Sequence, residues 1–203
     1  MDKKERIRKI NMFYKELHKN EAVEFHYKGF FDIILGWDDF REGKWMEEID
    51  LCAFYKKKNG ETGGVFTNTY NQNKMTEGSL SESPFMFLIG DERMDSKFQC
   101  EDIIRVASIH EMEEVYLVAI DYNAAIEEKT GFDLPVLLEI NGTHLMAKMS
   151  YSRTINDHGA ILLLATLKES GNSSVVITNK SKQMSLSDAY SEIPGFDSIV
   201  TQD

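Results

Sequence analysis

The chain of 203 residues has only two cysteines and three prolines. The cysteines, Cys52 and Cys100, are too few for the disulfide framework of a small secreted domain, so free thiols in a reducing compartment are expected. Long hydrophobic runs are also missing: the longest ones, such as residues 160–164, are far short of the ~20 residues that cross a bilayer. The charged residues 1–5 lead into no apolar signal sequence, so we expect a cytoplasmic protein without a transmembrane segment.

Basic side chains are in the minority. The chain has 23 Lys and Arg residues against 34 Asp and Glu residues, which gives a formal net charge of −11. A nucleic-acid-binding protein needs a basic surface, so nucleic acid is not expected as a primary partner. The excess of carboxylates suits cations, basic partners or simple solubility. The length allows a single domain of good size.

Familiar catalytic motifs are absent. The sequence contains no G-x-S-x-G elbow, H-E-x-x-H helix, P-loop or G-x-G-x-x-G turn. Cys52 is expected inside a strand, and Cys100 lies among acidic residues that disfavour a thiolate. The histidines are scattered, and none forms a metal-ligand spacing with Cys or Asp. Since no nucleophile–base pair is apparent, we predict that the protein is not an enzyme.

Residues 2–19 show the one clear helical pattern. Apolar side chains recur there at helical spacing, with Lys and Glu between them: Ile7, Ile10, Phe13, Tyr14 and Leu17. The pattern predicts an N-terminal helical arm over residues 1–20. This arm would pack on its own domain, or contact another protein or a second copy of the chain.

After Asn20 the period changes from helical to two residues. Residues 49–55 alternate between two faces, and Asn59-Gly60, Asn141-Gly142 and Ser170-Gly171 are hairpin turn signals. Further strands are expected at 30–37, 63–68, 85–89, 103–107, 114–122, 136–140, 144–151, 160–168 and 173–178. Short helices are expected at 123–129 and 185–191, the second with Ser185 and Asp188 as a capping box. Many short strands with few helices predict an all-β sandwich or barrel over residues 21–194, followed by a flexible tail over 195–203.

Acidic residues gather beside turns and strand ends. Glu48 and Asp50 share one face of a strand, and Asp38, Asp91 and the pair Glu101-Asp102 lie in other connections or at strand starts. A hard cation such as Ca²⁺ takes six to eight oxygen ligands, which loops at one end of a sandwich can supply. A solvated acidic rim with no metal is the other interpretation of the same residues.

Several of these segments resemble the TerD family of tellurite-resistance and stress-response proteins, which are calcium-binding β-sandwiches. The family motifs G-L-G-W-D, F-D-L-D-A-S-A-F and G-D-N-x-x-G, with closing acids, correspond to residues 35–38, 48–54, 90–92 and 101–102. The likeness covers roughly residues 23 to 190. It implies a β-sandwich of two mainly antiparallel sheets, here with the N-terminal α-helix added. The metal ligands that it implies are Asp38, Glu48, Asp50, Asp91, Glu101 and Asp102.

Departures from the family pattern concern the metal. Residues 93–99 have lost the family's glycines, which let backbone carbonyls turn toward an ion. Cys100 replaces an expected Asp, and residues 149–151 lack another expected acid. The resemblance therefore implies one Ca²⁺ site rather than two.

The function implied by the resemblance is that of a non-catalytic, calcium-binding stress-response protein that acts through protein partners. Two alternatives remain open. One is a metal-free structural or interaction module. The other is a sandwich that binds a small carbohydrate or lipid on an exposed aromatic platform, for which Trp37, Trp45 and Tyr70 are the candidates.

Overall fold

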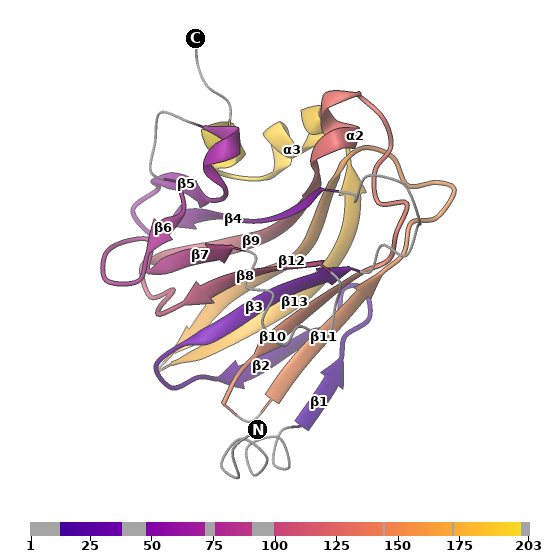
Figure 1. Ribbon diagram of the computed structural model, residues 1–203. Helices are drawn as coiled ribbons and strands as arrows, with labels where there is room; N and C mark the ends of the chain where they lie inside the picture. Colours follow the sequence, from indigo (N-terminus) through magenta and orange to yellow (C-terminus); the bar gives the residue numbers. More distant parts are fainter. Residues whose placement is uncertain are drawn as a thin grey trace.

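The computed structural model describes residues 13–37, 48–71, 76–90, 100–143, 145–171 and 173–199. In this part of the chain two mainly antiparallel sheets lie face to face (Figure 1). Seven-stranded sheet A has the order β1-β11-β10-β3-β8-β7-β6, and six-stranded sheet B the order β2-β13-β12-β9-β4-β5. No helix among the described residues is long and apolar enough to cross a membrane.

The strands of sheet A are β1 (Phe13–Glu16), β3 (Phe31–Trp37), β6 (Gly78–Ser79), β7 (Met86–Gly90), β8 (Cys100–Val106), β10 (Val136–Asn141) and β11 (Leu145–Tyr151). Those of sheet B are β2 (Ala22–His26), β4 (Ile49–Lys57), β5 (Thr62–Val65), β9 (Met112–Asp121), β12 (Ile161–Gly171) and β13 (Ser174–Met184). The helices are α2 (Tyr122–Ile126), α3 (Leu186–Glu192) and the 3₁₀ turns η1 (Asn68–Tyr70) and η2 (Phe196–Ile199).

The local turn and cap signals are confirmed. Asn59-Gly60, Asn141-Gly142 and Ser170-Gly171 each lie at the hairpin between two paired antiparallel strands. Ser185 caps α3, with Asp188 completing the capping box. These features depend on a few neighbouring residues, which is why the sequence predicts them well.

The main core lies between the two sheets. Alternate residues of β3 and β4 meet there, with side chains that are almost wholly buried: Phe31, Ile33 and Leu35 from sheet A, and Ile49, Leu51 and Ala53 from sheet B. The two-residue period of a strand places these residues on one face. Their burial against one another holds the sheets together.

A second core covers the outer face of sheet B. The other face of β4 contributes Cys52 and Phe54, which pack against Phe196 and Ile199 of η2 and Ala189 of α3. The two-faced alternation predicted for residues 49–55 is thus confirmed. The ring centroids of Phe54 and Phe196 are 5.0 Å apart, and both side chains are fully buried.

The prediction of a loose tail from residue 195 is wrong for residues 195–199. Phe196 and Ile199 are 0% and 8% exposed, because the outer face of β4 needs an apolar cover. Residues 200–203 lie outside the described residues.

The helical prediction for residues 2–19 is wrong where the structure describes that segment. Phe13–Glu16 is strand β1, which pairs in parallel with β11 at the edge of sheet A. Leu17 is 2% exposed and its amide donates to the carbonyl of Lys148, whereas Phe13 is 75% exposed. Residues 13–16 form backbone hydrogen bonds with the edge of β11, and this partner cannot be inferred from the spacing of apolar residues in the segment itself. Residues 1–12 lie outside the described part.

We expect Leu17→Ala to lower the free energy of unfolding by about 2–5 kcal/mol, because it empties a buried leucine site. Phe13→Ala, four residues earlier on the same segment, should change it by less than about 0.5 kcal/mol. Chemical denaturation of both variants measures the difference. Equal, small effects would contradict the integration of this segment into the core.

Candidate functional site

Four of the six predicted metal ligands lie in the described part of the chain. Glu48 precedes β4, Asp50 lies in β4, and Glu101 and Asp102 lie in β8. Asp38 and Asp91 lie outside the described residues. The question is therefore how β4 of sheet B and β8 of sheet A meet.

One hydrogen bond joins the two strands across the sheets. The amide of Leu51 donates to Oδ2 of Asp102 over 2.9 Å. Strand β5 pairs with β4 only from Ala53 to Lys56, so among the described strands the edge of β4 is open at Leu51. The Asp102 carboxylate supplies the acceptor that this buried amide needs on the open edge. We call this place the β4–β8 corner, formed by Asp50, Leu51 and Asp102.

Asp50 is a half-buried carboxylate at this corner. It accepts a hydrogen bond of 2.5 Å from the hydroxyl of Tyr70 in η1. Burial raises the pKa of Asp50, the Tyr70 bond opposes that shift, and the charge of Glu48 adds to it. Among the described residues, the side chains that shift the pKa of Asp50 include a second carboxylate and no basic group. The ionised form of Asp50 is therefore disfavoured.

Cys52 lies beside this corner in β4 and is completely buried. Its pKa is raised well above the ordinary value, first by complete burial and then by the charges of Asp50 and Asp102. The thiol therefore stays protonated and acts as a small apolar core side chain, as the sequence predicts.

Within the described residues, no three His, Cys, Asp or Glu side chains form a group that could hold a metal ion. Because two predicted ligands are outside this part, the calcium site stays a prediction. Glu101 and Asp102 are neighbours in a strand and project to opposite faces of β8. Asp102 is the member of this pair that bonds β4.

The aromatic platform expected for a carbohydrate or lipid site is not formed by Trp37 or Tyr70. Trp37 is 6% exposed and belongs to the main core. Tyr70 packs edge-on against Phe66 and Tyr122 while its hydroxyl binds Asp50. Trp45 lies outside the described residues.

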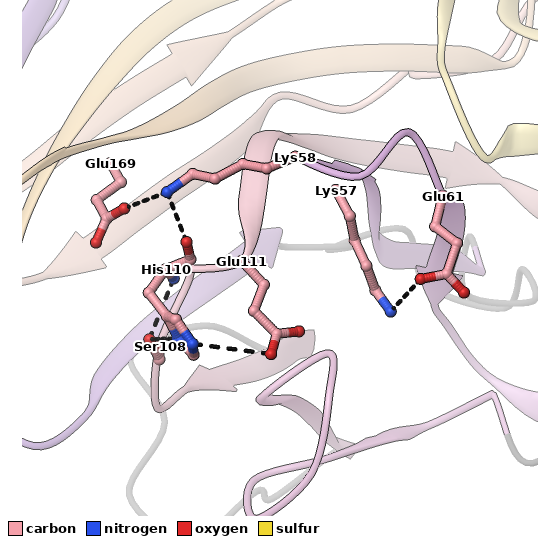
Figure 2. Close-up of polar contacts among 7 residues, drawn as sticks. All are labelled: Lys57, Lys58, Glu61, Ser108, His110, Glu111 and Glu169. Atoms are coloured by element: carbon pink, nitrogen blue, oxygen red, sulfur yellow. Dashed lines mark hydrogen bonds and ion pairs between the residues drawn. The ribbon is translucent and has the colours of Figure 1, made fainter.

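A network of charged side chains ties the hairpins together at another end of the strands (Figure 2). Lys58 donates to Glu169 over 2.8 Å and to the carbonyl of His110 over 2.6 Å. It thus links the β4–β5 turn to the β8–β9 turn and to the end of β12. The Ser108 hydroxyl lies 2.9 Å from Nδ1 of His110 and also accepts the His110 amide over 3.2 Å. The second bond makes this pair a local turn motif. The network therefore connects the ends of neighbouring strands at the surface.

Comparison with known proteins bears on the fold alone. No protein-family model matches the chain, and no curated protein matches it. A crystal structure described as that of the unknown function protein SAV2460 is similar, with a TM-score of 0.50 and 11% sequence identity. The likeness covers 77% of this chain and 94% of that chain.

We expect Asp102→Ala to lower the free energy of unfolding by about 1–3 kcal/mol, because it leaves the buried Leu51 amide without this acceptor. Asp102→Asn keeps an acceptor oxygen and should cost less. Glu82→Ala, at an exposed position, is the control for loss of a carboxylate. Urea denaturation measures all three, and equal stability of the Ala variant and the control would contradict the role of this bond.

The raised pKa of Asp50 predicts a pH dependence of stability. The folded protein holds the Asp50 proton more tightly than the unfolded chain does, and this difference stabilises the fold. The contribution is fully present below the ordinary pKa of 3.8 and is lost as the pH rises through the higher pKa of Asp50 in the folded protein. In metal-free buffer, Asp50→Asn should therefore gain melting temperature relative to the native chain as pH rises from about 4 to 8. Parallel pH profiles for the two proteins would contradict the assignment.

Proposed function

We propose that this protein is a non-catalytic β-sandwich domain of the TerD type that binds one Ca²⁺ at the β4–β8 corner. It would act through protein partners in a stress response of the tellurite-resistance kind. The two mainly antiparallel sheets agree with the fold that the sequence resemblance implies.

The observation that carries the proposal is the environment of the Asp50 carboxylate. Burial and the nearby Glu48 charge both penalise its ionised form, and Asp102 approaches the next residue from the other sheet. A divalent cation bound by Asp50 and Glu48 would offset the desolvation of Asp50 and the repulsion between the two carboxylates. Carboxylate oxygens are also the ligands that Ca²⁺ prefers.

The strands that lead to the remaining predicted ligands support the same corner. β3 ends at Trp37, which pairs with Cys100, and β7 ends at Gly90, which pairs with Ile103. Both partners lie in β8, one on either side of Asp102 in the sequence. The sequence continues from these strand ends into Asp38 and Asp91, which remain proposed ligands. Glu48 is exposed directly before β4 and can complete the set.

The test is calcium binding by metal-stripped protein. At about 100 times its dissociation constant, Ca²⁺ should stabilise the fold by about 2.7 kcal/mol, and Mg²⁺ should do less because it requires tighter octahedral geometry. Isothermal titration and thermal melts of the native chain, Asp50→Asn and Glu82→Gln measure the effect. The Asp50 variant should lose binding, while Glu82→Gln, an exposed control, should retain it.

The absence of any calcium effect on the native chain would contradict the metal part of the proposal. It would favour the alternative of a metal-free interaction module. Calcium binding that survives Asp50→Asn would place the ion elsewhere and contradict the β4–β8 corner.

A further inference from the structure

A polar pocket of about 350 Å³ opens at the other edge of the molecule, where β1 and β11 of sheet A approach β13 of sheet B. Its floor consists of the buried residues Leu17, Tyr151 and Asn179. Its rim comes from two segments, the end of β1 with the residues after it and the end of β11 with the loop after it. The rim residues are Glu16, His18, Lys19, Ser150, Ser152, Thr154 and Asp157. The pocket shares no residue with the β4–β8 corner.

Hydrogen bonds hold the floor in place. The Asn179 amide donates to the carbonyl of Leu17 over 2.8 Å, and the Ser181 hydroxyl donates to Oδ1 of Asn179 over 2.7 Å. The pairing of β12 and β13 shifts at this point, and Ser181 has a φ of 39°. A bulge in a strand redirects side chains and is common beside binding sites. Here it places Ser181 in the pocket wall.

The rim carries charges of both signs, among them Asp157 and Lys19. Asp157 accepts bonds from the amide and hydroxyl of Thr154 over 2.7 and 2.8 Å. Those bonds, together with Tyr151 and the positive charge of Lys19, lower the pKa of Asp157. The carboxylate is therefore ionised at neutral pH.

Lys19 and Asp157 are close enough to affect each other, yet no ion pair within the described residues joins them. Both residues line the pocket. His18 adds a second basic group beside Lys19, and Glu16 adds a second carboxylate to the rim. A simple anion would be repelled by Asp157 and Glu16, and a simple cation would be repelled by Lys19, so the charges of the rim favour neither.

We propose that this pocket binds a free α-amino acid, with the ligand's carboxylate at Lys19 and its ammonium group at Asp157. Hydroxyl groups of Ser150 and Ser152 on the rim can hydrogen-bond the polar atoms of the ligand. The pocket volume is at the lower end of the ~300–1,000 Å³ that small-molecule sites occupy, which suits a ligand of this size.

The experiment is a binding screen of the full chain against each of the twenty L-amino acids, by thermal shift and then by calorimetry. At least one amino acid should bind with a millimolar or lower dissociation constant. Its N-acetyl derivative and its methyl ester should each bind at least tenfold more weakly, because each removes one charge of the zwitterion. No binding by any of the twenty, or equal binding of the derivatives, would overturn the proposal.

Two variants locate the site. Lys19→Gln and Asp157→Asn should each weaken binding of the amino acid found in the screen at least tenfold. Asp157→Asn keeps an oxygen that can accept the hydrogen bonds from Thr154, so it removes the charge and leaves the turn in place. Lys28→Gln and Asp197→Asn make the same charge changes at exposed positions outside the pocket and should leave binding unchanged. Melting temperatures of the four variants show whether each is folded. Binding that is unaffected in folded Lys19 and Asp157 variants would overturn the assignment.

Discussion

Sheet B has apolar side chains on both faces, and burying both is the constraint on which the rest of the structure depends. In β4 the two sets alternate strictly, with Leu51 and Ala53 on the inner face and Cys52 and Phe54 on the outer. Apolar surface gains about 25 cal/mol for each Å² removed from water, so neither face can be left open. Sheet A covers the inner face, and the segment from α3 to η2 covers the outer one.

The same constraint separates what the sequence predicts from what it does not. Strand alternation, hairpin turns and the Ser185 cap depend on neighbouring residues, and all are confirmed. β1 and η2 depend on partners far along the chain: the open edge of β11 and the outer face of β4. The helical spacing of residues 7–17 and the sequence of residues 195–203 do not indicate either partner. Long-range pairing therefore decides the elements that the sequence predicts wrongly.

The candidate sites divide in a similar way. Asp50 and Asp102 are named by motif resemblance, but the bond from Leu51 to Asp102 requires knowledge of where β5 stops pairing. Tyr70 as the partner of Asp50 has no signal in the sequence. The pocket at Lys19 and Asp157 joins residues from three distant segments, and its one local hint is the Thr154-x-x-Asp157 spacing of a side-chain-capped turn.

The contact between η2 and the edge strand β5 ties two distant parts of the sequence together. Gly195 has a φ of 88°, and a Cβ there would lie 2.4 Å from the carbonyl oxygen of Gly63. Two backbones meet at this point with no room for a side chain. A side chain at position 195 would push this segment away from β5, and Phe196, which packs against Phe54, is the next residue in the chain. Among the described strands β5 is the last of sheet B, so this contact gives it a second backbone neighbour besides β4.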